Sequence, residues 1–378
     1  MTDATFTNAR LVLRNEIIDG HLAVRDGKIA GLGTGPTAGE DVDGDFLIPG
    51  LIELHTDNIE KNLQPRPGML WPTPLAAIIA HDTACAGAGI TTVYDSVSVG
   101  MYADAPGRRE FLRVTVDSVK QGMANDLFRA EHFLHMRCEL PDAAVLDLME
   151  SIWDEPLLTL LSLMDHTPGQ RQWRDMEKYR VFLTPRLKQG ETFEGRVADR
   201  VAKGQELAPK HRSAILERWR AKGARLPLAS HDDTTLDHVA EAKRDGVTIA
   251  EFPTTHEAAA ALKAANIGVL MGAPNVVRGG SHSGNVSALD LAANGLVDGL
   301  SSDYAPFSLL HGGFLLHQNA GMTLPDAIAT VTATPARLAG LSDRGAIEEG
   351  LRADLVRVRL VDGLPVVRAV WRAGIRVA

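Results

Sequence analysis

Short apolar runs alternate with longer amphipathic segments through the middle of the chain, between residues 47 and 303. The runs are nearly continuously apolar, as is typical of buried strands, and segments between them, such as 142–155, 235–246 and 256–266, have helical periodicity. Eight runs have this character: 47–57 (LIPGLIELHTD), 89–98 (GITTVYDSVS), 131–140 (EHFLHMRCEL), 157–166 (LLTLLSLMDH), 226–233 (LPLASHDD), 247–255 (VTIAEFPTT), 267–274 (IGVLMGAP) and 296–303 (LVDGLSSD). This alternation predicts an α/β fold with a parallel sheet. Eight repeats favour a closed (β/α)8 barrel of the TIM type over an open doubly wound sheet.

Both ends of the chain have a different pattern. Residues 9–15, 20–33, 45–50 and 353–378 contain short apolar runs, several of them alternating, broken by glycine, asparagine and aspartate. We expect the two ends to pair into one small β domain.

The connection between the fourth and fifth runs is unusually long. Residues 167–225 contain 15 Lys and Arg against 7 Asp and Glu, so this segment has a net charge of +8 and the rest of the chain −17. Two stretches in it, 172–182 and 210–222, have helical character. Because an insertion after a barrel strand lies over the catalytic face, we expect a basic helical lid at about 167–225, with a solvated surface insertion as the alternative.

The composition limits the classes of protein. In 378 residues, 39 Lys and Arg oppose 48 Asp and Glu, a net charge of −9, which argues against a dedicated nucleic-acid binder. The two cysteines, Cys85 and Cys138, cannot form a disulfide framework and favour a reducing compartment. No apolar run reaches the roughly 18 residues of a membrane span, and the N-terminus lacks an apolar signal segment. We expect a soluble, cytoplasmic protein that binds neither nucleic acid nor membrane.

Polar side chains recur at the C-terminal ends of the apolar runs, where a barrel gathers its strands around one pocket. His55 and Asp57 are two residues apart on one strand and therefore face the same side. The other polar residues at these ends are Glu139, Asp165, His166, His231, Asp232 and Asp303. A single polar residue at a strand end is usually a cap or turn residue, but five such ends in one frame predict a metal site.

We expect two divalent metal ions at this site, with zinc as the first choice and manganese or iron as alternatives. The predicted ligands are His55, Asp57, Glu139, His166, His231 and Asp303. Glu139 would bridge the two ions, since no lysine ends any of the runs to supply a carbamylated bridge. Asp303 would also accept the proton of the attacking water, which makes it the predicted catalytic residue. His81 and Asp82 precede a strand instead, and we expect them to be structural.

The segment 271–286 has the composition of an anion-binding loop. Its glycines let the backbone approach a phosphate, and its arginine can make bidentate contacts to phosphate oxygens, although the Gly-Lys-Ser/Thr ending of a P-loop is missing. The predicted substrate contacts in it are Arg278, Gly279, Gly280, Ser281, His282 and Ser283, with an ordinary turn as the alternative. Further candidate contacts are Gln170 and Arg171, Arg137 on the same face as Glu139, and Lys61 and Arg66, for which a solvated surface charge is the alternative.

Two segments of the sequence resemble motifs of the amidohydrolase superfamily. The segment 46–57 (FLIPGLIELHTD) is similar to its first-strand motif, and 340–358 (GLSDRGAIEEGLRADLVRV) to the segment that returns the chain to the small β domain. The resemblance implies a (β/α)8 barrel at 49–339 joined to a small β-sandwich built from residues 1–48 and 340–378. The departure is Asp57, where most members have histidine.

With Asp57 and several longer motifs, the sequence resembles one branch of the superfamily, the alpha-D-ribose 1-methylphosphonate 5-triphosphate diphosphatases of the carbon–phosphorus lyase pathway. Motifs such as 129–141 (RAEHFLHMRCELP), 162–172 (SLMDHTPGQRQ) and 271–286 (MGAPNVVRGGSHSGNV) carry this resemblance, which runs almost end to end. It implies a phosphorylated ribosyl substrate, hydrolysed to its 5-phosphate and diphosphate in phosphonate catabolism, and the same six metal positions. A homo-oligomer is compatible with the superfamily, although the sequence has no interface pattern.

The sequence is also compatible with two other functions. The first is a two-metal amide or cyclic-amide hydrolase of deacetylase or aminoacylase type, whose pocket would lack clustered arginine and lysine. The second is a barrel scaffold without catalysis, which would have gaps among the metal positions, whereas all six are filled here.

Overall fold

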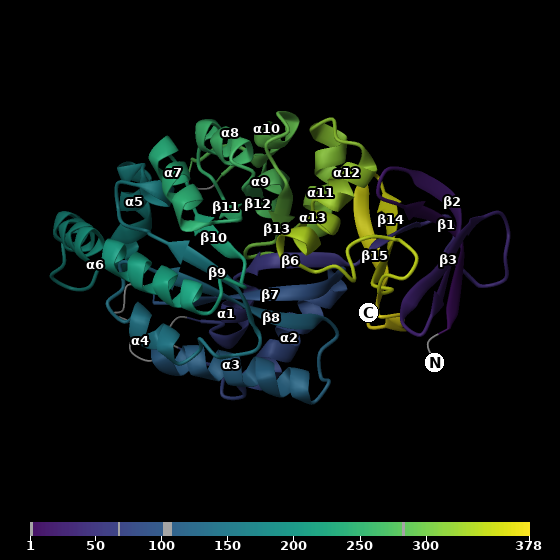
Figure 1. The fold of residues 1–378 in the computed structure, drawn as a ribbon, viewed down its shortest axis with the longest axis horizontal. Helices are drawn as coiled ribbons and strands as arrows, with labels where there is room; N and C mark the ends of the chain where they lie inside the picture. The colour runs from purple at the N-terminus through teal and green to yellow at the C-terminus, as the bar shows by residue number, and fades with distance from the viewer. Residues whose placement is uncertain (1–2, 67–68, 101–107, 282–283) are drawn as a thin grey trace.

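The computed structural model describes residues 3–66, 69–100, 108–281 and 284–378. In this part of the chain, eight parallel strands form one barrel sheet in the order β13-β12-β11-β10-β9-β8-β7-β6 (Figure 1). They are β6 (Leu51–Thr56), β7 (Ile90–Val99), β8 (Glu131–Glu139), β9 (Leu158–Met164), β10 (Leu228–His231), β11 (Ile249–Glu251), β12 (Gly268–Gly272) and β13 (Gly299–Ser301). Each strand overlaps one of the eight predicted runs, and a parallel bridge between Thr56 and Asp303 joins the first strand to the last. The predicted barrel is therefore confirmed.

Helices follow the strands and cover the outside of the barrel (Figure 1). They are α1 (Asn58–Leu63), α2 (Pro74–Gly87), α3 (Arg108–Ala124), α4 (Val145–Glu150), α7 (Leu236–Asp245), α8 (His256–Ala264), α9 (Ala273–Arg278), α10 (Ala288–Ala293), α11 (Ser308–Asn319), α12 (Leu324–Ala329) and α13 (Ala333–Leu338). The helices α4, α7 and α8 lie in the three segments with predicted helical periodicity. Local capping explains two of the starts, because the hydroxyls of Thr235 and Thr255 accept hydrogen bonds from the first-turn N–H groups of α7 and α8.

Both termini contribute to a second sheet, beside the barrel. Its strands are β1 (Ala4–Val12), β2 (Ile17–Arg25), β3 (Lys28–Thr34), β4 (Glu40–Asp41), β5 (Phe46–Pro49), β14 (Leu355–Val361), β15 (Leu364–Arg372) and β16 (Ile375–Arg376). The main order is β16-β15-β14-β5-β1-β2-β3. The rings of Phe6 on β1 and Trp371 on β15 lie 4.6 Å apart, so the sheet curls around its own core. The expected β domain from both ends is present, and the chain positions that divide it from the barrel stay a prediction.

The long connection between β9 and β10 contains the helices α5 (Met176–Leu183) and α6 (Phe193–Ala221) at one end of the molecule (Figure 1). Trp173, Tyr179, Leu183 and Phe193 form a small hydrophobic core of its own. The far part of α6 packs Ile215, Leu216 and Trp219 into the main core. None of the helices in the described ranges, α6 included, is long and apolar enough to cross a membrane.

Candidate metal centre

A cavity of about 690 Å³ opens at the C-terminal ends of the barrel strands. Side chains from the strand ends form its floor, and residues from the insertion between β9 and β10 line it as well. All six predicted metal ligands line this cavity: His55, Asp57, Glu139, His166, His231 and Asp303. The barrel thus gathers residues that lie far apart in the sequence into one place, as the positions at the strand ends predict.

The backbone bends sharply at the mouth of the barrel. Asp232 and Phe252 directly follow β10 and β11, and Asp303 lies two residues after β13. Their φ angles are 57°, 56° and 53°, in the left-handed region that non-glycine residues seldom adopt. Such strain is typical of functional sites, and here it accompanies two carboxylates, Asp232 and Asp303, that line the cavity.

His55, Asp57 and Asp303 form the first cluster, in which one potential ligand atom from each residue lies within 4.8 Å of the others. The Nδ1 atom of His55 lies 2.7 Å from Oε1 of the buried Glu251, and its Nε2 atom lies 3.8 Å from Oδ1 of Asp57. A carboxylate on one ring nitrogen orients the other nitrogen, which is the usual arrangement of a metal-binding histidine. Ser162 donates a hydrogen bond to the second Glu251 oxygen at 2.7 Å and fixes that carboxylate.

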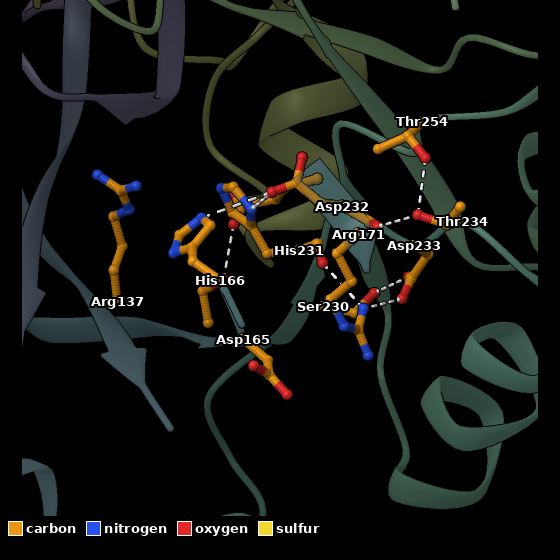
Figure 2. A network of polar contacts seen from close by, with 12 residues as sticks. Arg137, Asp165, His166, Arg171, Ser230, His231, Asp232, Asp233, Thr234 and Thr254 are labelled. Atoms are coloured by element: carbon orange, nitrogen blue, oxygen red, sulfur yellow. Dashed lines mark hydrogen bonds and ion pairs between the residues drawn. The ribbon is translucent and has the colours of Figure 1, made fainter. Parts of the chain in front are cut away.

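His166, His231 and Asp232 form the second cluster. Oδ2 of Asp232 lies 2.6 Å from Nδ1 of His231 and 3.6 Å from Nε2 of His166. Figure 2 shows both imidazoles beside this carboxylate. Asp232 is among the polar residues at the strand ends but is not one of the six predicted ligands; it follows β10 in the left-handed conformation and lies next to His231.

Glu139 lies beside the second cluster and holds His166. The backbone N–H of His166 donates to Oε1 of Glu139 at 3.0 Å, and Nδ1 of the same histidine lies 2.5 Å from Oε2. Burial lowers the pKa of His166, but the charges of Glu139 and Asp232 outweigh it and raise the pKa to about 10. The role of Glu139 as a bridging ligand stays a prediction.

Arg137 reaches the first cluster and forms an ion pair with Asp57. Burial raises the pKa of the Asp57 carboxyl, but the charge and hydrogen bond of Arg137, together with the charges of His55 and His231, outweigh burial, and the pKa is lowered overall. Burial raises the pKa of Asp303 to about 7, with a further contribution from the negative charge of Asp57. The pKa values of the two carboxyl groups in this cluster are therefore shifted in opposite directions: that of Asp57 is lowered and that of Asp303 is raised.

These residues fit a divalent metal. The Nε2 atom of His231 is buried without a hydrogen-bond partner in the described part of the chain, which is costly unless another group binds it. Imidazole nitrogens and carboxylate oxygens together are the donors that zinc, manganese and iron use. The negative potential that raises the pKa of His166 also favours a metal cation.

The predicted substrate contacts separate into two groups. Arg137 and Ser281 line the cavity, and Lys61 lies near its rim, donating to the carbonyl of Tyr304 at 3.0 Å. Gln170 and Arg171 line a different cavity, between the insertion and α7. Arg278, Gly279 and Gly280, together with Arg66, are not among the described residues that line the metal cavity, and His282 and Ser283 lie outside the described residues.

Arg171 is a predicted substrate contact that the structure places away from the metal cavity. Its guanidinium is buried, 2.7 Å from Oδ1 of Asp233 and 2.9 Å from the carbonyl of His231 (Figure 2). The residue therefore supports the turn after β10.

Three arginines that the sequence did not single out complete the wall. Arg186, Arg196 and Arg200, all from the insertion, line the cavity together with Arg137. The guanidinium of Arg186 lies 4.0 Å from the centre of the Phe182 ring, and that of Arg200 lies 2.5 Å from the Tyr179 hydroxyl. Helical periodicity alone could not show which side of the insertion faces the barrel.

A separate buried network lies between α2, β7 and β8. Asp95 accepts hydrogen bonds from His81 and His132, each at 2.8 Å, and His132 also contacts Asp82 at 3.3 Å. Burial lowers the pKa of His132, but the two aspartates outweigh it and raise the pKa to about 9. These side chains are fully buried and do not line the metal cavity, in keeping with the structural role expected for His81 and Asp82.

Comparisons with known proteins agree with this architecture. A sequence model described as the amidohydrolase family matches residues 210–377. The alpha-D-ribose 1-methylphosphonate 5-triphosphate diphosphatase of Escherichia coli (strain K12) is 44% identical over 379 residues, covering 98% of this chain and 99% of that protein.

Solved structures with the same fold are much more distant in sequence. The N-acetylglucosamine-6-phosphate deacetylase of Pasteurella multocida aligns with a TM-score of 0.61 at 12% identity, covering 99% of both chains. The N-isopropylammelide isopropylaminohydrolase of Burkholderia multivorans aligns with a TM-score of 0.56 at 18% identity, covering 100% of this chain and 98% of that chain. At these identities the structures support the fold alone.

Proposed function

The chain belongs to the amidohydrolase superfamily, in the branch of the alpha-D-ribose 1-methylphosphonate 5-triphosphate diphosphatases, and from this premise we propose that it is a hydrolase of that triphosphate. The products are the 5-phosphate and diphosphate, in phosphonate catabolism. The observation that carries the proposal is a single cavity that is lined by two His/carboxylate clusters and by four arginines.

We propose two divalent cations, one held by each cluster. His55, Asp57 and Asp303 would hold one, and His166, His231 and Asp232 the other, with Glu139 close enough to His166 to orient or join the second. Bound cations of this kind lower the pKa of water and offset the charge of phosphate oxygens. The residues around the clusters would then bind the substrate and accept the proton of the attacking water.

The arginines are suited to hold the triphosphate chain. Arg186, Arg196 and Arg200 come from the insertion, whereas Arg137 comes from the barrel, so basic groups lie on two sides of the cavity. Guanidinium groups bind phosphate oxygens bidentately, and phosphoryl transfer depends mainly on positioning and charge stabilisation. We infer that the insertion acts as a basic lid. The overall charge of −9 is therefore no obstacle, because the substrate meets this local field.

Asp303 is the proposed general base. Its carboxyl lines the cavity, and burial together with the Asp57 charge raises its pKa to about 7. A carboxylate beside the proposed cations is placed to take the proton of the attacking water. Asp57 is held ionised by Arg137 and is therefore the poorer base of the two.

Amide hydrolysis is disfavoured by the same cavity. An amide or cyclic-amide hydrolase needs a metal site but no group of cations, whereas the described wall contains four arginines.

Buried, unpaired Cys85 and Cys138 agree with a reducing compartment, and we propose the cytoplasm.

Phosphorus NMR of the turnover of the ribosyl triphosphate in ¹⁸O-labelled water tests the proposal. We expect diphosphate and the 5-phosphate, with ¹⁸O in one of them identifying the phosphorus that is attacked. Turnover of N-acyl compounds, with the triphosphate left intact under full metal loading, would contradict it.

A further inference from the structure

The barrel wall closes imperfectly between β6 and β13. Deeper in the barrel, the link between α12 and α13 lies between the two strands, because Ile52 N–H donates to the carbonyl of Val331 and Leu300 N–H to that of Thr330, each at 2.9 Å. At the mouth, direct pairing resumes, and Asp303 N–H donates to the carbonyl of His55 at 3.0 Å. Between these two zones the facing backbone groups need other partners.

Glu53 occupies this gap. Its side chain is fully buried, and its two carboxylate oxygens accept hydrogen bonds from opposite sides of the seam. Oε1 accepts from the backbone N–H of His55 at 2.7 Å, and Oε2 accepts from the backbone N–H of Ser302 at 2.6 Å. One carboxylate therefore joins β6 to the turn after β13, where regular strand pairing would otherwise supply the hydrogen bonds.

The two donors flank the first cluster. His55 N–H belongs to a predicted metal ligand, and Ser302 directly precedes Asp303. Any change in the separation of these two amides moves the backbone of His55 relative to that of Asp303. Glu251 differs, since it contacts the ring of His55 and orients that side chain without touching the seam.

We propose that Glu53 is a positioning residue that sets the spacing between His55 and Asp303 for metal binding. The proposal rests on the metal centre of the proposed function. Glu53 is not among the described residues lining the cavity, so it acts through the two backbones and not on the substrate. A carboxyl group suits this position because it has two oxygens, each of which can accept a hydrogen bond from one of the two N–H donors.

Cobalt binding by the full-length protein tests the proposal, because Co²⁺ absorption reports ligand geometry without any turnover. In Glu53→Gln, one N–H donor would face an amide NH₂ and lose its acceptor. We expect the Co²⁺ affinity to fall about 10- to 100-fold, the range for partners that support metal ligands, with a shifted visible spectrum. Hydrogen exchange should also become faster in peptides spanning 51–57 and 298–304.

Asp82→Asn is the matched control. The Asp82 carboxylate is equally buried and accepts hydrogen bonds from the N–H groups of Arg129 and Ala130, both at 2.9 Å, away from the cavity. We expect this variant to lose stability while keeping wild-type Co²⁺ affinity and spectrum. Equal Co²⁺ affinity, spectrum and exchange in Glu53→Gln and the wild type would overturn the proposal.

Glu53→Asp covers the case in which the glutamine variant does not fold. It keeps the carboxyl group with both oxygens but withdraws them by one methylene group, so it should fold and still weaken Co²⁺ binding; wild-type affinity in this variant would overturn the proposal. A wild-type protein that binds no Co²⁺ would count against the metal centre itself, whereas exchange at the two amides would still decide the role of Glu53.

Discussion

The guanidinium of Arg137 forms an ion pair with the carboxylate of Asp57. Asp57 is the residue at which the chain departs from the superfamily motif, where a second histidine is usual. The two residues lie 80 positions apart in the sequence and meet because β6 and β8 both end at the barrel mouth. The positively charged guanidinium of Arg137 thus lies beside the first cluster. It would compete with a metal ion for Asp57, but it also presents positive charge to an anionic substrate.

Replacing Arg137 by methionine should separate these two effects. Without the guanidinium, Asp57 is free for the metal, so we expect the Co²⁺ affinity of the protein to rise. The loss of a donor to the phosphate oxygens should lower kcat/KM by about 10²- to 10³-fold. Arg137→Lys, which retains the charge, should fall between the variant and the wild type in both measurements. A parallel loss of affinity and activity would show that Arg137 only maintains the fold.

Asp303→Asn should remove turnover while leaving binding largely intact. The amide keeps the shape of the side chain but cannot accept the proton of the attacking water, and general bases contribute about 10²- to 10⁴-fold to rate. Metal content by elemental analysis and binding of a non-hydrolysable triphosphate by calorimetry would accompany the rate measurement. Near-normal turnover with full metal occupancy would exclude Asp303 as the base.

Much of this site could be predicted from the sequence, because one simple pattern encodes it. Apolar runs that end in histidine or carboxylate predict both the strands and the direction of the ligands, as for His55 on β6 and His231 on β10. The same pattern does not distinguish Asp232 as a member of the second cluster, because its place beside His231 goes with a left-handed conformation after the strand that the sequence does not reveal.

The partners of the arginines could not be predicted in the same way. Arg171 and Arg186 belong to one basic insertion, yet Arg171 is paired with the buried Asp233 and Arg186 lines the cavity. Charge density along the sequence predicts that a segment is basic. Which guanidinium remains available to a ligand depends on tertiary contacts that a single sequence does not contain.

The arginines of the insertion should act mainly on substrate binding. We expect Arg186→Met and Arg200→Met each to raise KM for the triphosphate by about tenfold or more, since hydrogen bonds to charged groups contribute about 1.5–3 kcal/mol. The effect should weaken as salt is added. Arg218→Met on the same helix as Arg200 is the control, because Arg218 is exposed and pairs with Glu150 at 3.1 Å. A similar rise in KM in the control would indicate a general charge effect.

The buried histidine network away from the cavity should set part of the pH dependence of stability. The pKa of His132 is about 9 in the folded protein against 6.5 for an ordinary histidine. Because the folded state holds the proton more tightly, its contribution of about 3 kcal/mol is fully present below pH 6.5 and is lost as the pH rises from 6.5 through 9. In His132→Gln, urea unfolding followed from pH 6 to 10 should show a lower free energy of unfolding at pH 6 and a flatter decline above it. His317→Gln, at an exposed position, should keep the wild-type slope. An unchanged slope in His132→Gln would mean that this histidine is neutral in the folded protein.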